Sequence, residues 1–217
     1  MDIAFHTATS QSHQLEHFQW FEQGFKRLGI KLRILDIYGD ADFHIISGPN
    51  FAYREWLGKP NVLMIDRAFW HPEKTGLWQS MDWISIGWLQ PNGSRIFNIG
   101  NGRKAPEVAP RKSEGGTIYL RDYQSDHEEE ADTVRYHPSE RKSEETLDQA
   151  LERHSIAIGY KTSALVTAAL KGLEVICKDE RNIMSEPNWL ELLPYADWHF
   201  SEIQSGEALE CLWSSLK

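Results

Sequence analysis

The sequence predicts an α/β protein made of two small lobes, each with a mainly parallel sheet covered by helices. Short apolar runs alternate with stretches of helical periodicity along the chain, and strand–helix–strand order is typical of parallel sheets. A stretch rich in glycine and proline at residues 98–116 divides the chain near its middle. We therefore expect lobes at residues 1–105 and 117–217, a linker at residues 106–116, and a ligand-binding cleft between the lobes.

Length and composition agree with a folded protein of this kind. The chain has 217 residues, of which 41% are hydrophobic and 25% are charged, as in ordinary domains that bury a core. No apolar run reaches the roughly 18 residues that a membrane-spanning helix needs, and residues 1–10 lack the pattern of a secretory signal. The 2 cysteines fit neither a disulfide framework nor a zinc site. We therefore expect a reduced, cytoplasmic protein without a membrane span.

The net charge of −9 is concentrated in the second half of the chain. Residues 1–110 carry 11 basic and 11 acidic side chains, whereas residues 111–217 carry 12 basic and 21 acidic ones. A protein that binds duplex DNA needs a concentrated positive face, so this balance argues against DNA binding. A local basic pocket for one phosphate group is compatible with it.

In the first lobe, the main helix is expected where apolar residues recur at helical spacing, namely at Leu15, Phe18, Phe21, Phe25 and Leu28. Gly29 follows them, and glycine favours helix C-termini. The strands are expected in short apolar runs at residues 2–6, 31–37, 43–47, 62–65 and 83–88. A short helix is expected at residues 53–57.

The second lobe shows the same alternation. Its strands are expected at residues 117–120, 134–137, 156–158 and 175–177. Its helices are expected at residues 144–153, 162–171, 189–193 and 203–216.

The most informative segment runs from residue 155 to residue 179. An apolar strand ends in the polar turn Gly159-Tyr160-Lys161-Thr162-Ser163, where a helix of small residues begins. A helix N-terminus offers free N–H groups and the positive end of the dipole, and Lys161 adds a full charge, so this turn has the ingredients of a phosphate site. An ordinary N-cap explains the Thr and Ser residues as well, and both interpretations stay open.

This segment resembles the donor-binding stretch of GT-B glycosyltransferases, especially the capsule-polysaccharide and CMP-sugar transferases. In that group a strand is followed by a Ser/Thr pair, a helix and a Gly-x-Pro-Val step, and a His-Pro pair lies upstream, as His137-Pro138 does here. Residues 190–212 are similar to the tail of such proteins. The resemblance covers roughly residues 117–212. It implies a GT-B-like fold of two Rossmann-like lobes, with a nucleotide-sugar donor bound by the second lobe.

The resemblance also implies a set of residues that hold the phosphate groups of the donor: His137, Tyr160, Lys161, Thr162 and Ser163. Two positions depart from the family pattern. Thr167 stands where the family usually has the Glu that binds the donor ribose, and Glu174 stands where Pro is usual. Threonine can still donate or accept one hydrogen bond, so Thr167 stays a nucleotide-binding candidate, but it cannot supply a charged acceptor to two ribose hydroxyls. Whether catalysis is retained is therefore open.

Inverting sugar transfer needs a general base close to the acceptor hydroxyl, and in GT-B enzymes this base usually comes from the first lobe. His6 and Asp66 are the candidates, because each stands at the end of an expected strand. A structural hydrogen bond or cap is the alternative for both residues. Arg121, just after the strand at residues 117–120, is a further phosphate-binding candidate, with a surface role as its alternative.

No metal cofactor is expected. Residues 40–42 (DAD) match the metal-nucleotide signature of a different glycosyltransferase fold, and three residues match by chance often. Residues 13–17 (HQLEH) match the inverted zinc-peptidase signature, but no downstream segment supplies the third ligand that zinc needs.

The expected function is transfer of a sugar from a nucleotide-sugar donor to an acceptor hydroxyl. Two alternatives stay open: a non-catalytic binding or accessory protein on the same fold, and a nucleotide-sugar epimerase. The sequence does not specify the sugar, the nucleotide or the acceptor.

Overall fold

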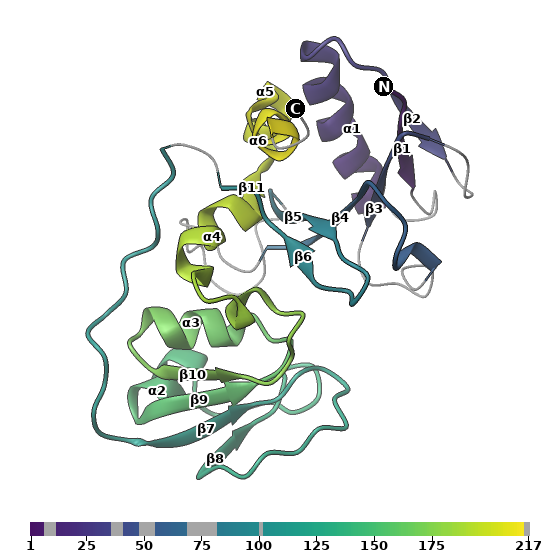
Figure 1. The fold of residues 1–217 in the computed structure, drawn as a ribbon. Helices are drawn as coiled ribbons and strands as arrows, with labels where there is room; N and C mark the ends of the chain where they lie inside the picture. Colours follow the sequence, from purple (N-terminus) through teal and green to yellow (C-terminus); the bar gives the residue numbers. More distant parts are fainter. Residues whose placement is uncertain (7–11, 36–40, 48–54, 69–81, 100–101, 215–217) are drawn as a thin grey trace. The chain divides into compact units, whose positions relative to one another are not determined.

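The computed structural model describes residues 1–6, 12–35, 41–47, 55–68, 82–99 and 102–214. The chain forms two compact units, of which unit 1 comprises Met1–Lys104 with Glu191–Lys217 and unit 2 comprises Ala105–Leu190. Each unit contains a sheet with parallel strands (Figure 1), which confirms the predicted α/β class. Within the part of the chain that is described, no helix combines the length and the apolar character needed to cross a membrane.

Unit 1 contains a 7-stranded sheet in the order β11-β5-β4-β3-β1-β2, with β6 paired to β5. Its strands are β1 (Ile3–His6), β2 (Leu32–Leu35), β3 (Phe43–Ser47), β4 (Val62–Arg67), β5 (Trp83–Leu89), β6 (Arg95–Ile96) and β11 (Asp197–His199). β1 to β4 are parallel to one another, whereas β5 is antiparallel to its neighbours β4, β6 and β11.

Three helices cover one face of this sheet: α1 (Ser12–Arg27), α5 (Phe200–Ser205) and α6 (Glu207–Trp213). Phe21 of α1 is fully buried in the same cluster as Ile3 and Phe5 of β1. Because successive strand residues point to opposite faces, Ala4 and His6 project from the other face. α1 thus confirms the helix that the apolar spacing predicts, and Gly29 follows it with a φ of 72°.

The last part of the chain belongs to unit 1, although the sequence suggested that residues 117–217 form one lobe. β11 pairs with β5, and Trp198 on β11 is only 1% exposed. Arg103 fixes this return: its guanidinium lies 3.9 Å from the centre of the Trp198 ring and forms an ion pair with Glu202. Unit 2 therefore ends within α4 (Trp189–Ala196) and does not extend to residue 217.

Unit 2 contains a 4-stranded sheet in the order β10-β9-β7-β8, in which all pairings are parallel. The strands are β7 (Gly116–Leu120), β8 (Thr133–Arg135), β9 (His154–Gly159) and β10 (Glu174–Cys177). The helices are α2 (Leu147–Glu152), α3 (Ala164–Leu170) and the short 3-10 helix η2 (Ile183–Ser185).

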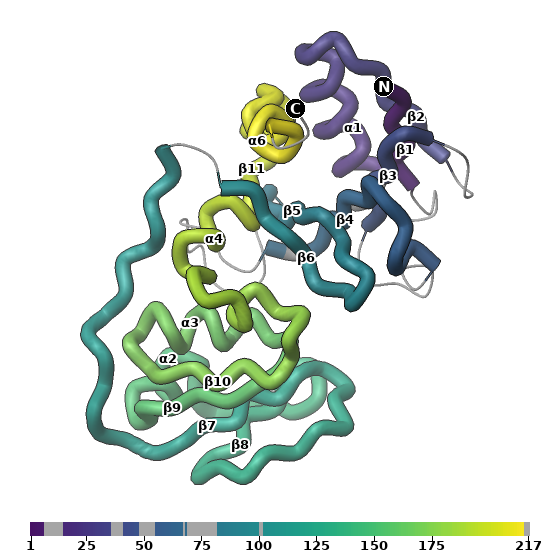
Figure 2. The backbone as a smooth tube through the Cα atoms, in the orientation of Figure 1, coloured from purple at the N-terminus to yellow at the C-terminus, as the bar shows by residue number. Residues whose placement is uncertain are grey.

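Residues 106–116, the expected linker, are part of unit 2 up to the start of β7 and can be followed in Figure 2. The N–H of Ala109 donates to the Leu170 carbonyl, and the N–H of Lys112 donates to the Gly172 carbonyl, both at 2.9 Å. Gly172 has a φ of 81°, and a Cβ at this position would lie 2.2 Å from the carbonyl oxygen of Pro110. Residues 106–115 lack helix and strand, as expected, but they pack against the end of α3.

Candidate functional site

Because the four strands of unit 2 are parallel, their carboxyl ends lie at one edge of the sheet, called here the carboxyl edge. The segments that leave the strands at this edge are residues 121–123, 136–137, 160–163 and 178–179. In open α/β sheets, ligands bind outside this edge. All predicted phosphate-binding residues of unit 2 lie in these segments, and Thr167 lies in the helix that follows one of them.

Residues 160–163 form a turn that is held by neighbouring loops. The N–H of Lys161 donates to Oδ2 of Asp122 at 2.9 Å. The side-chain amide of Asn182 donates to the carbonyl of Tyr160 at 3.0 Å. The backbone of this turn is therefore fixed from two sides.

The side chain of Tyr160 is fully engaged with its own unit. Its ring stacks on that of His127, with centroids 4.0 Å apart and an angle of 11° between the planes. Its hydroxyl donates to Glu129, and this hydrogen bond is the main cause that raises the pKa of Tyr160 to about 12. The phenol therefore stays neutral at physiological pH and is a donor that is already used.

The start of α3 differs from the prediction. The helix begins at Ala164 with Ser163 as its N-cap, so the expectation that Thr162 lies in the first helical turn is wrong. The Thr162 hydroxyl accepts a hydrogen bond from the N–H of Ala164 at 3.2 Å, a local turn that competes with helical backbone. The Ser163 side chain is exposed and makes no capping hydrogen bond. Its hydroxyl is thus accessible to a ligand, and Thr167 is half-buried one turn later.

His137 lies two residues after β8 on the same edge. Its Nδ1 accepts a hydrogen bond from the N–H of Ser139 at 3.2 Å, and its ring centroid lies 5.3 Å from that of Tyr123. Since β7 lies between β8 and β9, the strand ends that lead to His137 and Ser163 are roughly 10 Å apart. Contact of one phosphate group with both residues stays a prediction that this sheet order allows.

Asp122 is a polar residue of this edge that sequence reasoning missed. Its Oδ2 binds the turn at Lys161, whereas its Oδ1 is buried without a hydrogen-bond partner in the described part of the chain. Burial is the main cause that raises the pKa of Asp122. A buried carboxylate oxygen without a donor is costly and suits a ligand hydroxyl. The strand-end rule that selected Arg121 would have found Asp122 one residue later.

Glu174, the second departure from the family pattern, lies away from this edge. It is the first residue of β10, at the opposite end of the strand, and it forms an ion pair with Arg111. The residue that replaces the usual Pro therefore has a local structural partner.

In unit 1, the two candidate bases share one face of the sheet without meeting. By alternation from the buried core residues, His6 and Asp66 project from the face opposite to α1. His6 is level with Ile46 of β3, and Ile46 is level with Met64 of β4. Asp66 is two strands away and two residues further along, so the two Cα atoms are about 12 Å apart. His6 and Asp66 are therefore alternative candidates for the general base and do not act together as a pair.

The surroundings of the two candidates differ. His6 Nε2 lies 3.0 Å from Nδ1 of His44, and the His6 ring centroid lies 4.6 Å from that of Trp56. Burial, followed by the effect of His44, lowers the pKa of His6 to about 4, which leaves a neutral but weak base at pH 7. Asp66 is half-buried and lies opposite Ser85 of the antiparallel neighbour β5.

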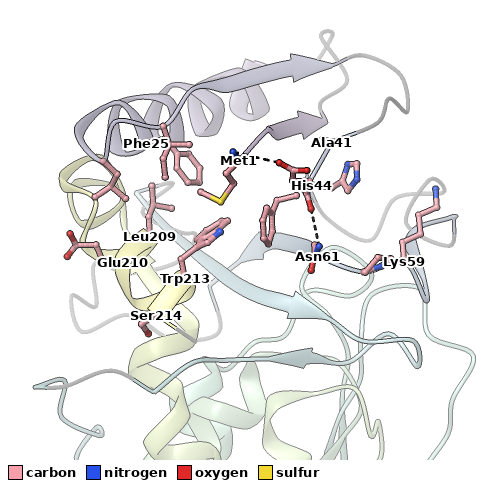
Figure 3. A pocket seen from close by; sticks show the side chains of 15 residues that line it. Met1, Phe25, Ala41, His44, Lys59, Asn61, Leu209, Glu210, Trp213 and Ser214 are labelled. Carbon is pink, nitrogen blue, oxygen red and sulfur yellow. Dashed lines mark hydrogen bonds and ion pairs between the residues drawn. The ribbon is translucent and has the colours of Figure 1, made fainter. Parts of the chain in front are cut away.

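A cavity of about 1140 Å³ in unit 1 lies at the amino-terminal ends of β3 and β4 (Figure 3). Apolar side chains form much of its lining, among them Phe25, Phe43, Leu209 and Trp213. None of the predicted site residues lines it. The cavity is thus separate from the strand ends that carry His6 and Asp66.

The described side chains include no group of three or more His, Cys, Asp and Glu residues that could hold a metal ion. Of the two short metal-type motifs, Asp40 and the side chain of His13 lie outside the described residues.

No protein-family model matches the chain, and no curated protein matches it. Among solved structures, the chain is similar to Thermosulfurimonas dismutans KpsC, a beta Kdo 2,7 transferase. This similarity has a TM-score of 0.51 and 11% sequence identity, and it covers 96% of this chain and 99% of that chain. At such low identity it shows a shared fold. The chain therefore has a glycosyltransferase-like α/β fold.

Proposed function

We propose that the protein is a glycosyltransferase that moves a sugar from a nucleotide-sugar donor to an acceptor hydroxyl. The observation that carries this proposal is the carboxyl edge of unit 2, where His137, Asp122 and the turn at residues 160–163 follow three adjacent strands. The similarity of the fold to that of a sugar transferase supports it.

On this proposal, the phosphate groups of the donor bind at the start of α3. The exposed Ser163 hydroxyl and the Lys161 ammonium group would hold them there, and His137 would contribute from the loop after β8, two strands away. Asp122 offers its buried Oδ1 to a ribose or sugar hydroxyl. This carboxylate would replace the charged acceptor that Thr167 cannot supply.

The reaction would be a substitution at the anomeric carbon. The acceptor oxygen forms the new bond to this carbon while the bond from the carbon to the donor phosphate breaks. The nucleotide leaves with the electron pair and an additional negative charge, which the Lys161 ammonium group would stabilise. The acceptor proton passes to Asp66 or His6 as general base.

One specific observation favours a second candidate, a binding protein that does not catalyse transfer. Thr167 and Glu174 both depart from the donor-site pattern, and Glu174 already pairs with Arg111. A fold that binds a nucleotide without turnover would tolerate both changes.

A thermal-shift panel of CMP, UDP, GDP and their sugar conjugates tests the proposal. A nucleotide at a hundred times its Kd should stabilise the protein by about 2.7 kcal/mol, and we expect one of the three series to do so. Release of free nucleotide from the stabilising sugar conjugate then measures turnover, with Asp66→Asn and His6→Gln as variants that should slow it. Stabilisation without release supports the binding protein, and a panel without any response contradicts nucleotide binding.

A further inference from the structure

A second polar feature of the carboxyl edge lies beside Tyr136, the residue that follows β8. The guanidinium carbon of Arg121 lies 5.2 Å from the centre of the Tyr136 ring, and that of Arg141 lies 5.4 Å from it. Arg121 follows β7, and Arg141 follows the turn after His137. Two cations from different segments thus meet at one ring.

Neither arginine has its charge compensated by an ion pair with a described carboxylate. Other arginines of unit 2 do form such pairs: Arg111 with Glu174, Arg153 with Glu145 and Arg181 with Asp179. The contrast is notable because residues 111–217 carry 21 acidic side chains against 12 basic ones. Two like charges in the lining of one pocket repel each other, and an anion bound in that pocket lowers this cost.

The arrangement is partly fixed before any ligand binds. Nε and Nη2 of Arg121 both donate to the Ser125 carbonyl, which orients the guanidinium plane. The N–H of Arg141 donates to the His137 carbonyl at 3.1 Å, which turns the chain back toward the strand end. A fixed donor loses less entropy when a ligand arrives.

The pocket that these groups line is large enough for a small ligand. A pocket of about 390 Å³ is lined by Arg121, Tyr136, Glu140 and Arg141. Glu140 brings one negative charge, but its Oε1 already accepts a hydrogen bond from the N–H of Gln124 at 2.6 Å. The lining therefore has an excess of positive charge and, as far as the described residues go, several guanidinium N–H groups without an acceptor, which match the oxygen atoms of an oxyanion.

We infer that Arg121 and Arg141 form an oxyanion-binding site, which takes the phosphate or carboxylate group of a small ligand. The inference rests on the proposed function in one respect, since it places an anionic group of the donor at this end of the carboxyl edge. The site itself stands on the geometry of the two arginines.

Calorimetric titration of the full chain with pyrophosphate and, separately, with glucuronate tests the inference at low ionic strength. We expect at least one probe to bind, and its affinity to fall at least tenfold in Arg121→Gln and in Arg141→Gln. The probe that binds more tightly identifies the group as phosphate or carboxylate. Arg111→Gln is the matched control, because Arg111 is an exposed arginine of the same unit that is already paired, and its affinity should stay within about twofold of the wild type. Because Arg141 is exposed, Arg141→Gln is expected to fold, and it alone decides the test if Arg121→Gln does not fold.

The outcomes separate this inference from the proposed function. The oxyanion site is refuted if neither probe binds, if the two arginine variants bind as tightly as the wild type, or if Arg111→Gln loses as much affinity as they do. Nucleotide stabilisation, together with probe affinity that is equal in the wild type and Arg141→Gln, would keep the proposed function and reject the site. Binding of a probe that depends on Arg141, without any nucleotide response, would keep the site and reject the nucleotide-sugar donor.

Discussion

Nε2 of His6 lies 3.0 Å from Nδ1 of His44, although 38 residues separate them in the sequence. The two strands that carry them are parallel neighbours, and His44 is level with Ala4, so both rings project from one face of the sheet. At this distance one nitrogen donates a proton and the other accepts it. The pair is therefore compatible with two neutral rings and is weakened when both become charged.

We predict that the free energy of unfolding falls as the pH is lowered from 6.5 toward 4. The pKa of His6 is lowered from 6.5 to about 4, mainly by burial. Between these values the unfolded chain binds a proton at His6 and the folded chain does not, so protons favour unfolding, whereas above 6.5 this contribution is constant. Urea unfolding across this range measures the effect. In His6→Gln, the free energy of unfolding should depend less on pH than in the wild type. The control is His127→Gln, at an exposed histidine, which should keep the pH dependence of the wild type. Equal slopes in the wild type and both variants would contradict the assignment of this effect to His6.

Gly172→Ala should lower the stability of the protein by about 2 kcal/mol or more. The φ of 81° alone costs a residue with a Cβ about 1–2 kcal/mol, and the new Cβ would meet the Pro110 carbonyl at 2.2 Å. Gly29→Ala is the control, because Gly29 has a similar φ of 72° and nothing within 4 Å of the added atom. Denaturant unfolding compares the two. Equal losses would show that the contact with residue 110 adds nothing.

The N-caps of α2 and α3 should respond differently to removal of their hydroxyls. Thr146 forms a capping box at α2: its hydroxyl accepts from the N–H of Gln149, and its own N–H donates to the Gln149 side chain. Thr146→Ala should therefore cost about 0.5–2 kcal/mol of stability. Ser163→Ala removes no capping hydrogen bond and should stay within about 0.5 kcal/mol of the wild type. Thermal unfolding of both variants distinguishes these expectations.

His137→Ala and Ser163→Ala should each weaken binding of the nucleotide that stabilises the protein, by about 0.5–3 kcal/mol. The reason is the loss of one hydrogen bond to phosphate in each variant, while folding stability is largely kept. Ser139→Ala is the control next to His137, because the Ser139 backbone, not its side chain, makes the contact with His137. Titration calorimetry with the nucleotide gives the affinities. Normal affinity in both variants would remove these residues from the site.

Local pattern was sufficient for most elements of the fold. The repeat that ends at Leu28 predicts α1, and the apolar runs at β1, β3, β4 and β5 were recognisable because a buried strand needs several apolar residues in succession. That residues 191–217 belong to unit 1 was not predictable in this way. Nothing near Trp198 in the sequence indicates that β11 pairs with β5, since that choice depends on which sheet edge is open.

The candidate site shows the same limit. The strand ends and the Thr-Ser turn indicated the carboxyl edge in the sequence. Parallel strands bring their carboxyl ends to one edge of the sheet, whatever segments connect the strands. The importance of Asp122 depends on one oxygen that has no hydrogen-bond partner among the described residues, and the proximity of Arg121 and Arg141 depends on the Tyr136 ring that both contact. Contacts of this kind form only after the sheet order is set.

The return of residues 191–217 to unit 1 has a consequence for synthesis on the ribosome. Unit 2 is a continuous segment, and its last residue emerges before β11, α5 and α6 do. Unit 1 lacks Ile203, Leu209 and Leu212 of its core until the final part of the chain is translated. The unit made first is therefore the last to be completed, and during translation the apolar surface that α5 and α6 cover in the finished fold stays exposed.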